Sequence, residues 1–143
     1  VADNWISFYE GEERIALGKT KLDVVRSKTD SFEIQLIYKS RGATRKVAIK
    51  RAENINYTFT QKDSLIQFDP YFNLPDDTKW RAQQVRILIK VPDSGSVYLD
   101  HSMRRIIDDI DNVTGTDDGA MVGKTWTMLQ NGLTCVGCDE EGL

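Results

Sequence analysis

The chain has 143 residues, of which 40% are hydrophobic and 29% charged, and its formal net charge is −3 at pH 7. This composition is typical of one folded, soluble domain and excludes a disordered tail. The balance of 19 basic and 22 acidic residues argues against a dedicated nucleic-acid binder, which is usually strongly basic. No apolar run approaches the roughly 20 residues that a membrane span needs.

Apolar and polar residues alternate along most of the chain, which predicts half-buried β-strands. The longest alternations place Phe32, Ile34, Leu36 and Tyr38 on one face of a strand, and Val85, Ile87, Ile89 and Val91 on one face of another. Shorter alternations occur at Leu22–Val24, Tyr57–Phe59, Ile66–Phe68, Val97–Leu99 and Trp126–Met128. Turn-forming residues separate these segments, beginning with Gly18, so we expect many short strands and an all-β architecture.

One segment departs from this alternation and predicts a short helix near 43–55. Ala48, Ala52 and Ile55 recur at helical spacing, and either Ser40 or Thr44 is suited to cap its start. We expect this helix to cross between strands with its alanines on the buried face. Residues 103–110 leave a helical turn and an irregular strand equally open.

Cys135 and Cys138 are the only cysteines, in a Cys-Val-Gly-Cys sequence near the C-terminus. The residues leave open a local disulfide, two free thiols, a redox pair and a metal site shared between copies. A redox pair usually begins a helix, whereas Gly137 argues against one here. A structural zinc site needs four ligands, more than one chain supplies at this point. No metal or cofactor is therefore expected.

Candidate catalytic groups are few, and we expect no enzymatic activity. His101 is the only histidine and follows Asp100, but neighbouring strand residues point to opposite faces, so an exposed turn histidine is expected. The acidic stretch 108–118 does not fit a calcium loop of the EF-hand type. Val113 stands where that loop needs an oxygen ligand, and Thr114 stands where it needs a glycine. We interpret the stretch as a solvated loop, with a non-standard calcium site as the alternative.

A basic cluster coincides with the expected helix and is a candidate for binding a partner. Such a patch suits anionic lipid headgroups or the acidic loop of a second copy, although a solvated helix face is the simpler interpretation. Its proposed partner-binding members are Arg41, Arg45, Lys46, Lys50 and Arg51. Two matches to the glycosylation sequon, at Asn56 and Asn112, arise by chance often enough to decide nothing.

Several segments together resemble the C-terminal extracytoplasmic region of PspC-domain (phage shock protein C) membrane proteins of Bacteroidetes. The resembling segments are Arg26–Lys28, Ala48–Gln61, Phe68–Phe72, Lys79–Arg81, Val85–Pro92, Val97–Asp100, Ile110–Val113, Trp126–Met128 and Gly132–Cys138. The resemblance covers most of the chain after about residue 20, and none of its motifs is catalytic.

This resemblance implies a toastrack-like domain on the periplasmic side of the inner membrane, as part of a membrane-anchored protein. It implies a sensory or interaction role in the envelope stress response, with an envelope protein or a second copy as partner. A periplasmic setting also favours a disulfide between Cys135 and Cys138.

We therefore expect one mainly β domain over residues 1–143: a β-solenoid-like stack of short strands with one short helix near 43–55, or alternatively a β-sandwich. A glycan- or calcium-binding module using Trp80, Trp126 and the acidic loop is the alternative function.

Overall fold

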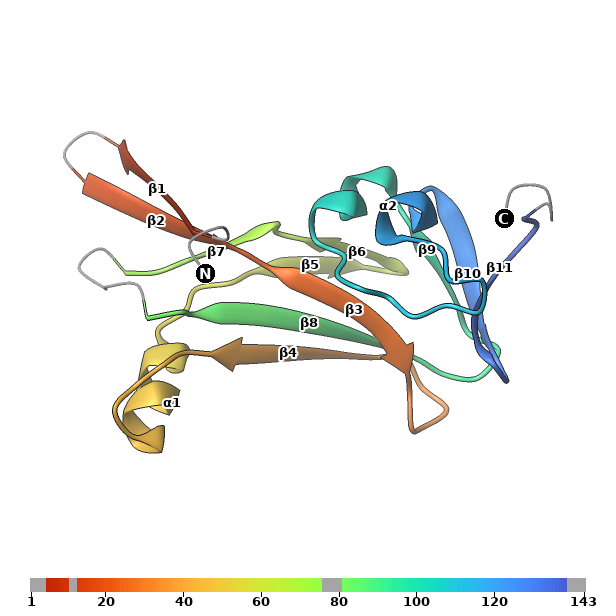
Figure 1. Cartoon of the computed structure of the whole chain (residues 1–143), viewed down its shortest axis with the longest axis horizontal. Helices are drawn as coiled ribbons and strands as arrows, with labels where there is room; N and C mark the ends of the chain where they lie inside the picture. The colour runs from red at the N-terminus through yellow and green to blue at the C-terminus, as the bar shows by residue number, and fades with distance from the viewer. Residues whose placement is uncertain (1–4, 11–12, 76–80, 139–143) are drawn as a thin grey trace. The chain divides into compact units, whose positions relative to one another are not determined.

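The computed structural model describes residues 5–10, 13–75 and 81–138, and β-strands dominate them (Figure 1). In chain order the elements are β1 (Trp5–Glu10), β2 (Glu13–Lys19), β3 (Lys21–Arg26), β4 (Glu33–Lys39), α1 (Arg45–Glu53), β5 (Phe59–Lys62), β6 (Leu65–Phe68), β7 (Tyr71–Asn73), β8 (Gln84–Val91), β9 (Ser96–Leu99), the 3-10 helix η2 (His101–Arg105), α2 (Asp118–Met121), β10 (Lys124–Leu129) and β11 (Gly132–Cys135).

These strands form several small sheets, so the expected mainly β class with one short helix is confirmed. The sheet orders are β1–β2–β7, β3–β8–β4, β11–β10–β9 and the hairpin β5–β6. No helix within the described residues is both long and apolar enough to cross a bilayer.

The chain divides into two compact units, each made of two segments. The first unit contains Val1–Lys21 and Leu36–Arg86, and the second contains Leu22–Gln35 and Ile87–Leu143. The expectation of a single domain over 1–143 stays a prediction.

In the first unit, β2 pairs with β1 on one side and with β7 on the other, both antiparallel. Gly18 lies inside β2, opposite Phe72 of β7, and a Cβ at position 18 would overlap the Phe72 ring. The interpretation of Gly18 as a turn residue was therefore wrong. The glycine is needed because the buried aromatic ring lies directly on the backbone.

The helix α1 begins one residue after Thr44, whose hydroxyl accepts a hydrogen bond from the Val47 amide at 3.2 Å. This is the arrangement that an N-cap residue provides. Ala52 and Ile55 are buried as expected, and Ala48 is half-buried. The predicted helix and one of its two candidate caps are thus confirmed.

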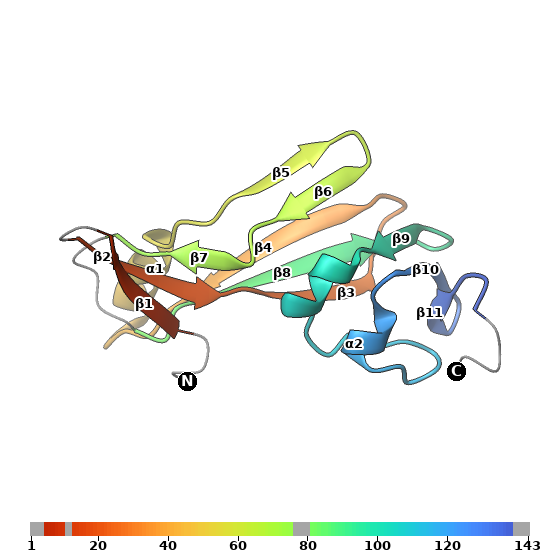
Figure 2. The ribbon, with the colours of Figure 1, turned by 90° about the horizontal axis from the view of Figure 1, so that it is seen from above.

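The hairpin β5–β6 also belongs to the first unit, and Figure 2 shows its two strands side by side. The rings of Phe59 and Phe68 face each other across the pair, with centroids 5.7 Å apart. Most of its other residues are exposed, including Leu65.

The alternation in β8 is confirmed, since Val85, Ile87, Ile89 and Val91 are all buried. The alternation over 32–38 is only partly realised, because Phe32 is 54% and Tyr38 37% exposed. Phe32 precedes β4, whereas Tyr38 lies in β4, which is an edge strand of its sheet and is covered less completely than a central one.

Candidate functional site

The outward face of the β9–β10–β11 sheet in the second unit presents a row of three side chains. Tyr98 pairs with Thr125 in the β9–β10 register, and the Val136 amide donates to the Thr125 carbonyl at 2.9 Å. Tyr98 and Val136 are 57% and 54% exposed. A second outward pair lies beside this row, where the Ser96 and Thr127 hydroxyls are 2.6 Å apart. The face therefore combines an aromatic ring, an aliphatic side chain and hydroxyl groups.

The opposite face of the same sheet is packed. Trp126, Met128 and Leu133 are buried, and the indole nitrogen of Trp126 donates to the Met121 carbonyl at 3.0 Å. This bond satisfies the one polar group of the indole ring, as burial requires. The packed layer fixes the positions of the outward side chains.

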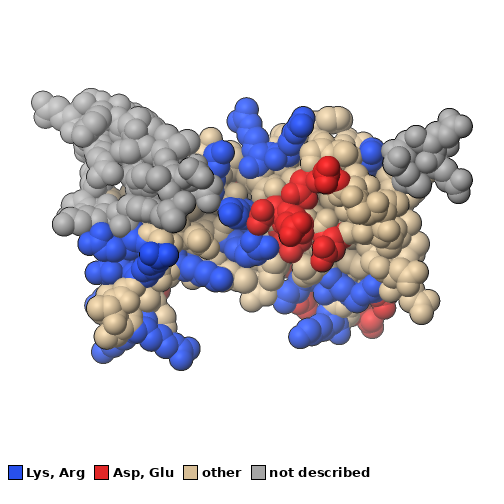
Figure 3. All heavy atoms as spheres, in the orientation of Figure 1, with Lys and Arg blue, Asp and Glu red and all other residues tan. Residues whose placement is uncertain are grey.

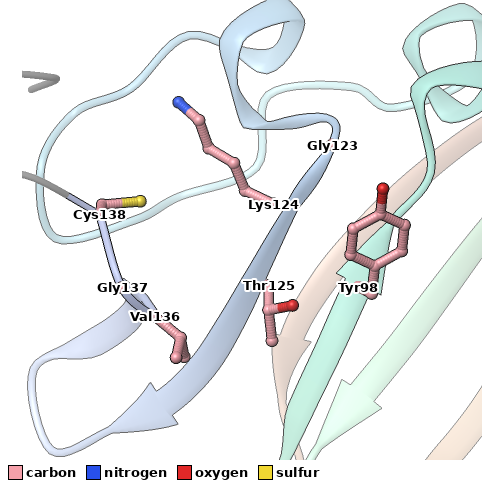
Figure 4. Close-up of a pocket in the computed structure, with 7 residues that line it drawn as sticks. All are labelled: Tyr98, Gly123, Lys124, Thr125, Val136, Gly137 and Cys138. Atoms are coloured by element: carbon pink, nitrogen blue, oxygen red, sulfur yellow. The ribbon is translucent and has the colours of Figure 1, made fainter.

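A shallow hollow of about 380 Å³ lies on the outward face, at the end of the sheet (Figure 4). The Tyr98 hydroxyl, the Thr125 hydroxyl and the Lys124 ammonium supply polar groups around it, and Val136 supplies an apolar wall. Its lining residues are Tyr98, Gly123, Lys124, Thr125, Val136, Gly137 and Cys138. The hollow is suited to a side chain or ring with an apolar body and a polar or anionic end.

The cysteine loop forms one wall of this hollow. Cys135 and Cys138 are joined by a disulfide, with their Cα atoms 5.6 Å apart. Gly137 takes a φ of 68°, a left-handed conformation that glycine adopts easily, and so allows the tight loop. The bond and the Val136 hydrogen bond to β10 together hold the loop against the sheet.

Asp100 and His101 follow Tyr98 closely in the sequence, but each has a structural role apart from the hollow. The Asp100 carboxylate caps η2 by accepting from the Ser102 hydroxyl at 2.6 Å and from its amide at 3.0 Å. The Ser102 hydrogen bonds lower the pKa of Asp100 below its usual value. His101 is exposed, as expected, and its ring lies against Gly123, where a Cβ would overlap it.

The acidic stretch 108–118 is a loop organised by its own side chains. The Asp118 carboxylate accepts from the amides of Asp109 and Ile110, at 2.7 and 3.0 Å. Figure 3 shows acidic side chains gathered on the molecular surface. In the described parts of the chain, no three His, Cys, Asp or Glu side chains form a group that could hold a metal ion.

Asn112 holds the middle of this loop through both ends of its amide. Its nitrogen donates to the carbonyls of Ile110 and Thr116, at 3.1 and 2.9 Å. Its oxygen accepts from the Thr116 amide at 2.8 Å and from the Thr114 hydroxyl at 3.0 Å. The sequon at this position therefore has its acceptor nitrogen engaged in the fold.

The five basic residues predicted to bind a partner lie in α1 and just before it. Figure 3 shows basic side chains gathered over this helix. Arg41, Arg45, Lys46 and Lys50 are exposed, while Arg51 is half-buried and donates to the Arg41 carbonyl at 3.1 Å. The structure thus places four of them in α1 and Arg41 just before it, and their binding role stays a prediction.

The two tryptophans expected to stack on a glycan have different outcomes. Trp126 is 1% exposed, so it cannot present a stacking surface and that part of the expectation was wrong. Its place in the alternation with Met128 already indicated a core position. Trp80 lies outside the described residues.

Sequence reasoning missed the outward residues of the hollow. Tyr98 alternates with the inward Val97 and Leu99, so its outward direction was readable from the sequence. Val136 gave no such signal, because it follows the last strand and its position depends on the loop that the disulfide closes.

Comparison with known proteins identifies a matching family. The sequence is similar, over residues 9–141, to the family described as "ToastRack found in some PspC". No curated protein and no solved structure matches the chain.

Proposed function

Because this chain belongs to the toast-rack family found in some PspC proteins, we propose that it is the extracytoplasmic interaction or sensory domain of a PspC-type membrane protein. The family match supports the association with PspC and hence a membrane-protein context. The periplasmic location, the stress-response role and an origin in Bacteroidetes are parts of the proposal.

The observation that carries an interaction role is the outward face of β9–β10–β11. Tyr98 and Val136 stay more than half exposed beside a hollow, although Trp126, Met128 and Leu133 are buried on the other face of the sheet. Exposed aromatic and aliphatic side chains grouped on a rigid support are typical of protein contact surfaces. We propose that an envelope protein, or a second copy of this chain, docks here.

The proposal includes the absence of enzymatic turnover. Asp100 caps a helix, His101 packs on a glycine and Asp118 closes a loop, so each of these groups has a structural task. The disulfide supports an oxidising compartment such as the periplasm, because cytosolic proteins are mostly kept reduced.

The test is crosslinking in cells of the full-length parent protein, with and without this domain, followed by mass spectrometry of what is captured. Replacing Tyr98→Ser together with Val136→Ser should reduce capture of the partner more than about tenfold, because anchor residues of this kind dominate interface energies. The matched control is Leu65→Ser, since Leu65 is 61% exposed on β6 in the other unit. Capture that is unchanged by deletion of the domain would contradict the proposal.

A glycan-binding module is the second candidate, and Tyr98 is the observation that favours it. An exposed aromatic ring beside hydroxyl groups is a common sugar-binding arrangement. Cell-wall glycans at 100 times their Kd should then stabilise the domain by about 2.7 kcal/mol in a thermal-shift measurement. No shift with glycans, together with partner capture, would decide for the protein-binding role.

A further inference from the structure

The exposed face of α1 combines basic side chains with one apolar side chain. Arg45, Lys46 and Lys50 are exposed there, and Ile49 lies among them with 49% of its surface accessible. The opposite face packs into the first unit, with Ala52 buried. Exposure of this isoleucine to water does not stabilise the protein, whereas covering its apolar surface would be favourable.

The cations of this face have no acidic partner in the part of the chain that the structure describes. The ion pair found there joins Arg26 to Asp93, in the other unit. Glu53 is the one acidic residue of the helix, against four basic ones. Helix stability does not account for Arg45 and Lys46, because they lie in the first turn, where positive charge opposes the helix dipole.

We propose that α1 is a contact for an anionic lipid surface. Arg45, Lys46 and Lys50 would meet the headgroup phosphates, and Ile49 would enter the boundary between headgroups and acyl chains. The proposal deepens the proposed function and rests on it, since a membrane-anchored parent holds the domain near a bilayer.

A bilayer fits this face better than a folded acidic protein. The helix is convex, its cations are spread along 6 residues from Arg45 to Lys50, and they end in flexible side chains. Such a face suits a fluid layer of phosphates, which needs no fixed geometry. A folded acidic protein would be expected to bind in a groove of this chain, or to pair its carboxylates with donors that this chain holds in fixed positions.

The expected affinity is modest and becomes effective through the anchor. Each basic residue near an anionic surface contributes about fivefold to binding, so three contribute on the order of 100-fold. Tethering to the same membrane then raises the effective concentration, so that weak contact becomes largely occupied.

The experiment measures cosedimentation of the full 143-residue chain with vesicles. One set contains phosphatidylcholine mixed with phosphatidylglycerol, and the other contains phosphatidylcholine alone. Binding should require the anionic lipid and should weaken as salt shortens the Debye length from about 10 Å at 0.1 M to about 3 Å at 1 M.

The variants separate a local contact from general charge attraction. Lys46→Gln with Lys50→Gln should weaken binding about 30-fold. The control is Lys28→Gln with Lys62→Gln, which removes the same charge from exposed positions elsewhere and should bind like the original protein. Ile49→Ser should weaken binding severalfold without changing its salt dependence.

Three results would overturn the proposal: no binding to anionic vesicles at low salt, equal loss in both lysine pairs, or lipid-free self-association that the Lys46 and Lys50 changes abolish. The last would assign α1 to a contact with a second copy of this chain. Failure here leaves partner capture by the parent protein unaffected, so it is distinguishable from failure of the proposed function.

Discussion

At the residue scale, Asn112 holds the middle of the acidic loop 108–118. Asn112 makes hydrogen bonds through both its nitrogen and its oxygen, to residues on either side of it. A side chain that is both donor and acceptor cannot be replaced by an isosteric acceptor without leaving carbonyl oxygens unpaired.

Asn112→Asp should therefore lower the free energy of unfolding by about 2 kcal/mol, because the new carboxylate faces the Ile110 and Thr116 carbonyls without a donor. Urea unfolding measures the change. Asn131→Asp, in an exposed turn, is the matched control and should have little effect. Equal effects of the two changes would contradict the assigned role of Asn112.

Tyr57 should make the stability of the first unit depend on pH in the alkaline range. Its hydroxyl donates to the Asp69 carbonyl at 2.7 Å, and burial of the ring raises its pKa well above the ordinary value. The neutral form is thus favoured in the folded state. The stabilisation is complete below the unfolded pKa of about 10 and is lost as pH rises above it toward the folded pKa.

Tyr57→Phe should lower stability by about 1 kcal/mol at neutral pH through loss of the hydrogen bond. The variant should also lose less stability than the original protein as pH rises above about 10. Urea unfolding across this range, with Tyr98→Phe as the exposed control, measures both. Parallel pH curves for all three proteins would refute the assignment.

Residue positions were predictable where one strand face is buried and unpredictable where a distant segment decides. The pattern of β8 gave its four buried residues directly. The role of Gly18 was hidden, because the ring that covers it comes from Phe72, 54 positions away in the sequence. The same applies to Val136 beside the hollow.

At the element scale, α1 was predictable and the pairing of strands was not. Helix signals are local, since spacing and a capping hydroxyl lie within the segment itself. Strand pairing joins distant segments, as in β2 with β7, and alternation alone does not identify the neighbour. The short β7 escaped prediction because three residues carry almost no periodic signal.

The Cys135–Cys138 loop should contribute modestly to stability. Changing both cysteines to serine should lower the free energy of unfolding by at most about 2 kcal/mol, because a four-residue loop restricts the unfolded chain little. A reductant should lower the free energy of unfolding of the original protein by a similar amount and leave that of the variant unchanged. Stabilisation of the reduced protein by zinc would instead favour a metal site.

At the scale of the whole molecule, stability should differ between sheets. The central strand β10 pairs with both β9 and β11 and buries Trp126. Within the described residues, β5 and β6 form a sheet of their own with only two strands. A two-stranded hairpin with exposed faces is marginally stable.

Amide hydrogen exchange should therefore be at least about 100-fold slower in β10 than in β5 and β6. Mass spectrometry of peptic fragments, or NMR, resolves the two regions. Equal protection of the two would mean that the hairpin is covered in solution, for example by a second copy.

The contact between Gly18 and Phe72 constrains how this family can diverge. A side chain at position 18 is acceptable only after the ring at position 72 has become smaller, because a Cβ there overlaps it. The order of substitutions therefore matters: Phe72→Leu opens space for Gly18→Ala, while the reverse order passes through an overpacked intermediate. The two positions are expected to covary among relatives, a historical dependence that neither residue shows when considered alone.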